Sequence, residues 1–357
     1  MRVNEEAVQL DYKALLSPER LVVAENALGE IADQVLGRLG AGPDGIPPRL
    51  LTAVEDGGLF DFCAWYQPIH FFGYDWGIFV REDCIVDLAT TIACFMPRSH
   101  PAGLHYPGHH YLVNQLVLAG FLSYFFHEHF HHKVESFGIR LWVVEKTARY
   151  VPYKHAVYRP TYPSKDNLEE ALANADSYRR FGTRPYTARL DPDVRKALRA
   201  ALRFLFSLSP PGYREASRYL AKPEFEPALW KLQAQIQDAS LTPSMDPRDW
   251  EFAPRSIQSF LNVASDIWLV VRVGRVPILP HVAPVRTPST REAAKLLRQR
   301  GYTELSGAGK GSHRKFVKEG EPTIILPAKR ERLSPGVAKN VAHALGLSGL
   351  GELLQAV

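Results

Sequence analysis

The feature that most constrains this chain is an apolar run at residues 111–126, YLVNQLVLAGFLSYFF. A helix that crosses a membrane needs about 20 consecutive apolar residues. This run is shorter, contains Asn114 and Gln115, and leads directly into a cluster of histidines. We therefore expect a buried central helix, in a protein that does not enter a membrane.

The composition is that of a globular protein with room for two or three domains. Hydrophobic residues make up 46% of the 357 positions and charged residues 23%, which argues against disorder. The N-terminus, Met1 to Glu6, lacks the basic stretch and apolar segment of a signal or transit peptide. We expect a cytoplasmic protein.

Three cysteines, Cys63, Cys84 and Cys94, cannot all pair with one another. Their spacing matches no CxxC metal or redox motif. We expect all three to be buried or half-buried free thiols.

Hydrophobic periodicity predicts an α+β protein with a mainly helical N-terminal part and a small sheet. The expected helices cover about 6–40, 84–95, 111–126, a stretch after Asn167, and most of 190–265. The expected strands lie within 60–80 and at 267–273, and 140–162 is expected to form a hairpin or an ordered flap. Prolines at 277, 280 and 284 predict a linker. We therefore expect a first region at 1–285, with a core at about 55–185 and a helical extension at 186–265, and a second domain at 286–357.

The positive charge of the chain belongs to the second domain. Residues 286–357 contain 13 Lys and Arg against 6 Asp and Glu, which leaves the first 285 residues with a net charge of −2. Clustered basic residues attract a phosphate backbone. RNA is therefore one partner to consider for this domain.

His127, Glu128 and His131 form an HExxH motif at the end of the expected central helix. The i,i+4 spacing places both imidazoles on one helix face, where they can bind one Zn²⁺. Glu128 would then act as the base that takes a proton from a zinc-bound water. The alternative is a chance match or a structural metal, because four of the six residues from 127 to 132 are histidine.

A catalytic zinc needs a third protein ligand, and we select Glu170. It lies in NLEEALANA, residues 167–175, a helical stretch with small residues that favour close packing; Glu170 and Asn174 share a face. These two segments resemble the gluzincin metallopeptidases, in which a downstream helix supplies a Glu ligand followed by Ala.

The gluzincin resemblance implies His127, His131 and Glu170 as zinc ligands and Glu128 as the catalytic base, acting on a peptide or protein substrate. Asn174 would be the hydrogen-bond partner of His127, at a position where the family has Asp. Glu169 and Glu135 remain alternatives to Glu170 as the third ligand.

Other polar residues have less specific expectations. Four could stabilise an oxyanion in a zinc hydrolase, although each is more simply a packing or surface residue: His155, Tyr162, Tyr178 and Arg179. Four upstream histidines are expected to be structural: His70, His105, His109 and His110.

The second domain has an expected α-β-β-β-α order, with a helix from Thr290, strands at 302–305, 312–318 and 322–326, and a helix at 334–345. It resembles the HicA family of mRNA interferase toxins through LLRQRGY (296–302), KGSHRKF (310–316), ILP (325–327), LSPG (333–336) and LGLS (345–348). The resemblance implies a fold like that of a double-stranded-RNA-binding domain.

In that family the strand histidine is catalytic, so His313 would transfer a proton during RNA cleavage, and Lys310, Arg314 and Lys315 would hold phosphates. Lys329 and Arg330 stand where many members have a further histidine. The domain could thus bind RNA or an antitoxin partner without cleaving RNA. The sequence leaves two main functions open: a zinc hydrolase with an RNA- or partner-binding tail, or a toxin-type RNA-binding or RNA-cleaving protein with a non-catalytic scaffold. A third possibility is a structural interaction protein with neither activity.

Overall fold

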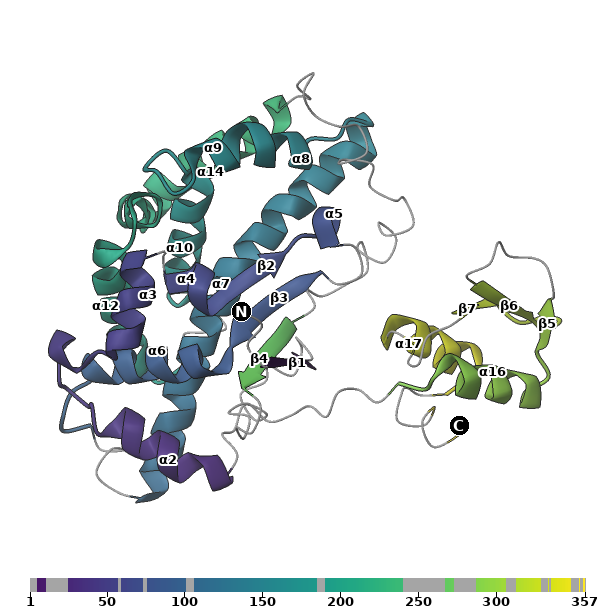
Figure 1. Cartoon of the computed structure of the whole chain (residues 1–357), viewed down its shortest axis with the longest axis horizontal. Coiled ribbons are helices and arrows are strands. Elements are labelled where there is room, and N and C mark those ends of the chain that lie inside the picture. Colours follow the sequence, from purple (N-terminus) through teal and green to yellow (C-terminus); the bar gives the residue numbers. More distant parts are fainter. Residues whose placement is uncertain are drawn as a thin grey trace. The chain divides into compact units, whose positions relative to one another are not determined.

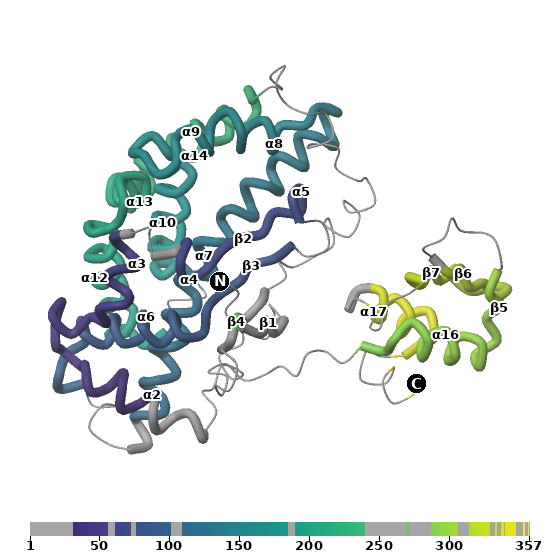
Figure 2. Tube along the Cα trace, viewed as in Figure 1, coloured from purple at the N-terminus to yellow at the C-terminus, as the bar shows by residue number. Residues whose placement is uncertain are grey.

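The computed structural model describes residues 5–10, 25–56, 59–72, 76–100, 106–184, 190–239, 267–272, 287–305, 313–328, 333, 335–347, 353 and 356 (Figures 1 and 2). The chain divides into two compact units, residues 1–281 and residues 282–357. The sequence placed this boundary near residue 285. The protein is mainly helical with two small sheets, as expected for an α+β chain.

The first unit is built mostly from helices. Its described helices are α2 (Glu25–Leu36), α3 (Pro48–Asp56), α4 (Leu59–Cys63), α5 (Ile69–Phe72), α6 (Glu82–Cys94), α7 (Tyr106–Glu145), α8 (Tyr150–Tyr153), α9 (Arg159–Thr161), α10 (Leu168–Arg180), α12 (Pro192–Leu208), α13 (Pro211–Arg214) and α14 (Lys222–Asp238). Short 3₁₀ turns at Pro43–Gly45 and Glu215–Tyr219 and a π-helical turn at Lys154–Tyr158 connect them. Of the region expected to be helical up to 265, residues 240–266 lie outside the described part.

The central helix α7 contains the apolar run 111–126 and continues through the histidine cluster to Glu145. Side chains on all its sides are buried, as in Leu116, Phe121 and Phe126, which is typical of a helix enclosed by its own protein. Helices α6 and α10 both pack against it (Figure 1). A Cβ at Gly120 would stand only 3.0 Å from the carbonyl oxygen of Ile85 on α6, so glycine allows the two helices to approach closely.

Four strands form the sheet of the first unit in the order β1-β4-β3-β2, with β1 (Glu5–Leu10), β2 (Ala64–Gln67), β3 (Gly77–Arg81) and β4 (Ile267–Arg272). The β3–β4 pair is parallel and the other two pairs are antiparallel. The aromatic segment 60–80 therefore contributes β2 and β3, as expected, with α4 and α5 beside them. Strand β2 ends the order and also packs on α7.

Residues 5–10 were wrongly expected to start a helix. They form β1, which pairs antiparallel with β4 from Glu5 opposite Arg272 to Leu10 opposite Ile267. Strand formation depends on partners that are distant in sequence, and here the partner lies more than 250 residues away. A local hydrophobic pattern contains no information about such a distant strand.

The segment 140–162 was also wrongly expected to be a hairpin or flap. It contains the end of α7, then α8, the π-helical turn and α9. Helix α8 packs back on α7 at Gly138, where a Cβ would stand 2.8 Å from the Cβ of Tyr150. Its aromatic and β-branched residues, such as Tyr150, Val151 and Tyr153, are buried by helix packing, which overrides their strand preference.

The expectation of three free thiols is wrong for two of the cysteines. Cys63 at the end of α4 and Cys84 in α6 form a disulfide, with 5.5 Å between their Cα atoms. Cys94 is free and buried. A disulfide depends on where the Cα and Cβ atoms lie in space, so a sequence separation of 21 residues gave no signal of it.

The second unit follows the order helix, three strands, helix. Its elements are α16 (Thr290–Gln299), β5 (Thr303–Leu305), β6 (His313–Val317), β7 (Ile324–Pro327) and α17 (Pro335–Ala344). The strands form an antiparallel sheet in sequence order. Ser289 and Glu292 form a capping box that starts α16, and the core contains Leu297, Phe316 and Val341.

Within the described residues, no helix has both the length and the apolar character required to span a membrane.

Candidate metal centre

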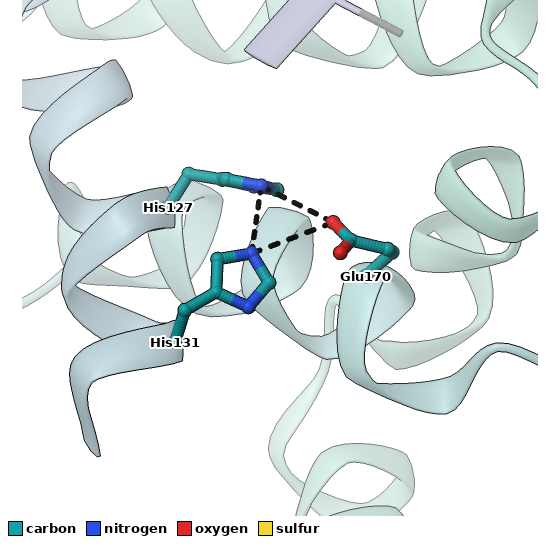
Figure 3. A group of neighbouring side chains, drawn as sticks. All are labelled: His127, His131 and Glu170. Carbon is teal, nitrogen blue, oxygen red and sulfur yellow. Dashed lines mark hydrogen bonds and ion pairs between the residues drawn. The ribbon is translucent and has the colours of Figure 1, made fainter. Parts of the chain in front are cut away.

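Two histidines on α7 begin the site. His127 and His131 are one helical turn apart, and both are buried, with exposed fractions of 0% and 8%. Figure 3 shows their rings turned toward the same point, facing Glu170. The distance between the two Nε2 atoms is 3.2 Å. The i,i+4 spacing has thus placed both imidazoles on one face of a buried helix.

Glu170 reaches this point from the first turn of α10. The helix begins after Asn167, whose side-chain oxygen accepts a hydrogen bond from the backbone N–H of Glu170 at 3.1 Å. Glu169 and Glu170 therefore occupy a helix N-terminus, where the helix dipole stabilises negative charge. Both carboxylates are only 1% exposed. The capping residue and the dipole together explain why two acidic side chains are accommodated in this interior.

The three side chains have the spacing of ligands that share one metal ion. Oε2 of Glu170 lies 3.3 Å from Nε2 of His127 and 3.5 Å from Nε2 of His131. Zinc bonds of about 2.0–2.1 Å in a tetrahedral arrangement put neighbouring ligand atoms about 3.3 Å apart. Oε2 of Glu170 is buried and has no hydrogen-bond partner among the described residues. Two imidazole nitrogens and one carboxylate oxygen thus fit a divalent metal ion.

Each of these three side chains also forms a hydrogen bond through the atom that does not face the common point. Nδ1–H of His127 donates to Oδ1 of Asn174 at 2.9 Å, because an amide oxygen can only accept. Nδ1 of His131 lies 2.6 Å from Oε1 of Glu169. The hydroxyl of Tyr158 donates to Oε1 of Glu170. These contacts leave both Nε2 atoms and Oε2 of Glu170 directed at the common point.

The two alternative ligands, Glu169 and Glu135, have other partners. Glu169 binds the outer nitrogen of His131 and lies 3.5 Å from Nζ of Lys154. Glu135 accepts hydrogen bonds from the hydroxyl of Tyr66, the backbone N–H of Ile69 and both the backbone N–H and Nδ1 of His70. Neither carboxylate belongs to the group formed by His127, His131 and Glu170.

Glu128 lies beside the metal-binding group without belonging to it. Its Oε1 is 4.0 Å from Nε2 of His127. This oxygen is buried and has no hydrogen-bond partner among the described residues, while the backbone of Tyr66 in β2 is hydrogen-bonded to the carboxylate. Burial raises the pKa of Glu128 well above its usual value, and the negative charges of Asp61 and Glu170 act in the same direction. The carboxylate of Glu128 is therefore more basic than that of an ordinary, solvated glutamate.

Burial and the charges of neighbouring groups shift the pKa values of the three candidate ligands. Burial lowers the pKa of His127. Burial also acts to lower the pKa of His131, but the carboxylates of Glu170 and Glu169 outweigh it and raise that pKa well above its usual value. Burial acts to raise the pKa of Glu170, yet the two histidines hold it well below normal. Glu170 is therefore ionised at neutral pH, as a metal ligand must be.

Sequence reasoning did not identify four residues around the site. Tyr158 binds Glu170, and Lys154 binds Glu169. The ring of Tyr213 stacks on the imidazole of His127, with 6.2 Å between the ring centres, and its hydroxyl donates to Oδ2 of Asp61 at 2.5 Å. No local spacing links these positions to the HExxH motif, since Asp61 and Tyr213 are 152 residues apart. A signal could only have come from knowledge of the helix packing.

The four residues considered for oxyanion stabilisation lie in different surroundings. His155 contacts Arg159, and the Arg179 guanidinium lies over the ring of Phe225. Tyr178 is buried and its hydroxyl accepts from Arg203 at 2.8 Å. Only Tyr162 reaches the site, where its hydroxyl donates to Asp61.

Three of the upstream histidines belong to the described part. His70 is bound to Glu135, and its ring packs on that of Tyr150. His109 and His110 are half-exposed near the start of α7. His105 lies outside the described residues.

The candidate RNA-contacting residues of the second unit are only partly described. His313 begins β6 opposite Pro327, whereas Lys310 lies outside the described residues. Arg314 forms a paired ion contact with Glu304 on β5, with nitrogen-to-oxygen distances of 2.7 and 2.8 Å. Lys315 is half-exposed on the next position of the strand. Arg298 lies 2.5 Å from the same carboxylate, so Glu304 is shared by two guanidinium groups. Arg314 is therefore already engaged in an ion pair within the domain.

Comparison with known proteins gives no match: no protein-family model, curated protein or solved structure is similar to this chain.

Proposed function

We propose that the first unit is a zinc-dependent hydrolase that cleaves peptide bonds. The observation that carries this proposal is the spacing of the three donor atoms of His127, His131 and Glu170, 3.2 to 3.5 Å from one another, with the unpartnered carboxylate oxygen of Glu128 beside them. Two histidines and one glutamate are a known ligand set for catalytic zinc. A structural zinc site would more often have four protein ligands.

Each residue has a definite task in this proposal. When bound, the metal ion would polarise the substrate carbonyl and lower the pKa of a water molecule. Glu128 would accept the proton of that water and later deliver it to the leaving amine. Asn174 and Glu169 fix the orientation and tautomer of the two imidazoles. Tyr158 donates a hydrogen bond to Oε1 of Glu170, so Oε2 remains available to bind the metal ion.

The neighbouring strand supports a polypeptide as the substrate. Strand β2 is at the end of the sheet order and contacts the metal-binding helix α7. The backbone of Tyr66 in this strand is hydrogen-bonded to Glu128, so a strand edge runs past the proposed base. An extended peptide can add to such an edge through main-chain hydrogen bonds.

To test this proposal, the zinc-loaded full chain is incubated with a proteome-derived peptide mixture, and new peptide termini are identified by mass spectrometry. Glu128→Gln keeps the shape of the side chain and should retain zinc, but should slow cleavage by about 100-fold or more because the base is lost. Removal of the metal with a chelator should stop cleavage, and added zinc should restore it. A zinc-loaded wild-type protein that produces no new termini would contradict the proposal.

For the second unit we propose binding of RNA or of a protein partner. The support is the α-β-β-β-α order of its elements, which is the order that the HicA resemblance implies. RNA cleavage that is lost in His313→Ala but unaffected by a chelator would add a nuclease function. Salt-independent or absent RNA binding would leave only the protein partner.

A further inference from the structure

One acidic side chain near the metal centre has no task in the proposed reaction. Asp61 lies in α4, and the residue is exposed, in contrast to the buried Glu128, Glu169 and Glu170. Its carboxylate is nevertheless partly desolvated by neighbouring groups, which together with the charge of Glu170 raises the pKa of Asp61 to about 6, so the group is still mostly ionised at neutral pH. Its Oδ2 accepts hydrogen bonds from the hydroxyls of Tyr213 and Tyr162. No Lys, Arg or His among the described residues forms an ion pair with Asp61, and the nearby Arg81 packs over Phe62 and pairs with Asp83 at 3.4 Å.

Two chains of aromatic contacts connect Asp61 to the metal-binding group. The same Tyr213 that binds Asp61 stacks on His127. Tyr162, the other partner of Asp61, stacks on Tyr158, which binds Glu170. Asp61 also interacts electrostatically with Glu128 and with His131. Asp61 therefore lies on the exposed side of the site, and a single tyrosine, Tyr213, contacts both Asp61 and the candidate ligand His127.

The charge balance of the site favours a cationic substrate group at this place. Four carboxylates, those of Asp61, Glu128, Glu169 and Glu170, interact with one another or with the same histidines. Lys154 neutralises one of them, and a divalent metal ion would neutralise two more. One formal negative charge would remain, and Asp61 is the carboxylate that solvent can reach. An unpaired carboxylate of this kind attracts and orients a positive group.

We propose that Asp61 binds the protonated α-amino group of a peptide, so that the metal centre acts on the first peptide bond of its substrates. This inference rests on the proposed hydrolase function and specifies its substrate class. Oδ2 is held in place by the two tyrosine hydroxyls, which leaves Oδ1 to accept a hydrogen bond from the ammonium group. Phe62 and Tyr162, with exposed fractions of 45% and 37%, flank Asp61 and offer apolar contacts to the first side chain of the peptide.

The test uses a pair of metal-directed ligands that differ only at the amine. Leucine hydroxamate carries a free amino group, and N-acetyl-leucine hydroxamate does not, while both have the same metal-binding group. Calorimetry on the zinc-loaded full chain should give at least a 10-fold tighter Kd for the free amine. Asp61→Asn should remove this preference while the acetylated ligand binds as before, because only the ammonium contact is lost.

Controls separate this inference from the proposed function. Asp166→Asn changes an exposed carboxylate that forms no side-chain hydrogen bond or ion pair within the described residues, and it should keep the preference. Zinc content of Asp61→Asn equal to wild type shows that the variant folds. Equal binding of the two hydroxamates to wild type would overturn the role of Asp61 and leave the metal centre intact. Failure of both hydroxamates to bind the zinc-loaded protein would instead count against the hydrolase site itself.

Hydrolysis kinetics provide a second test of the contact between Asp61 and the substrate amine. Aminoacyl amides with a free amine should be cleaved with a lower KM than their N-acetylated counterparts, and Asp61→Asn should raise KM for the free amines only. If Asp61 merely positioned its tyrosine partners, the variant would affect both substrate series equally, and the amine role would be overturned.

Discussion

The side-chain oxygen of Asn174 lies 2.9 Å from Nδ1 of His127, and the side-chain nitrogen of the same amide lies 3.3 Å from the backbone carbonyl of Tyr213. The second contact fixes the orientation of the amide, since only its nitrogen can donate to a carbonyl. His127 must then carry its proton on Nδ1. The lone pair on Nε2 is thereby left free to bind a metal ion.

Replacement of this amide should weaken metal binding. Asn174→Ala removes the acceptor for His127 and should lower zinc affinity about 10- to 100-fold. The measurement is competition against a chromophoric chelator. Ser177→Ala is a matched control on α10, because Ser177 is buried and hydrogen-bonded to the carbonyl of Ser123, away from the ligands. A loss of affinity in both variants would point to general damage to the helix packing.

The ligand assignment predicts a specific pattern of metal content. Elemental analysis after dialysis should find about one zinc per wild-type chain and none in His131→Ala or Glu170→Ala, because two remaining ligands hold zinc poorly. His129→Ala serves as the control, since His129 lies in the same cluster but packs on Phe125. Zinc retained in Glu170→Ala would mean that another group completes the site.

The disulfide predicts one free thiol per chain in unfolded, unreduced protein and three after reduction, as counted with a thiol reagent. Closing a loop with a sequence separation of 21 residues restricts the unfolded chain. Its loss in Cys63→Ala/Cys84→Ala should therefore lower the free energy of unfolding of the first unit by about 3 kcal/mol. Cys94→Ala is the control for removal of a buried sulfur without a bond. Three reactive thiols before reduction would disprove the bridge.

The Glu304–Arg314 contact predicts an acid dependence of the second unit. The hydrogen bond from Arg314 lowers the pKa of Glu304 to about 2, below the value of about 4.3 for an unfolded chain. The contribution of Glu304 to stability is thus complete above about pH 5 and lost as the pH falls toward 2. The two side chains are 25% and 27% exposed, so the effect should not exceed about 1 kcal/mol.

Urea titrations followed through the NMR signals of β6 between pH 6 and pH 2.5 measure this dependence. Glu304→Gln should be less stable than wild type at pH 6 and nearly equal to it at pH 2.5. A constant difference between the two proteins over that range would contradict the assigned pKa. The same variant also frees Arg314, so it should strengthen any RNA binding by this strand.

Elements with a strong local pattern could be predicted from the amino-acid sequence. The apolar run 111–126 and the motif at His127–His131 required a buried helix with two imidazoles on one face, because helical geometry relates positions four apart. The helical pattern after Asn167 similarly predicted the helix that the structure has as α10. The order of elements in the second unit also followed from alternating hydrophobic patterns and turn residues.

Contacts between residues far apart in the chain became apparent from the three-dimensional packing. It brought Glu170 rather than Glu135 to the two histidines, because α10 packs along α7 while Glu135 is occupied by Tyr66 and His70. It also paired β1 with β4, joined Cys63 to Cys84, and placed Asp61 beside Tyr213. These contacts arise from the packing of elements far apart in the chain, and local periodicity has no information about such packing.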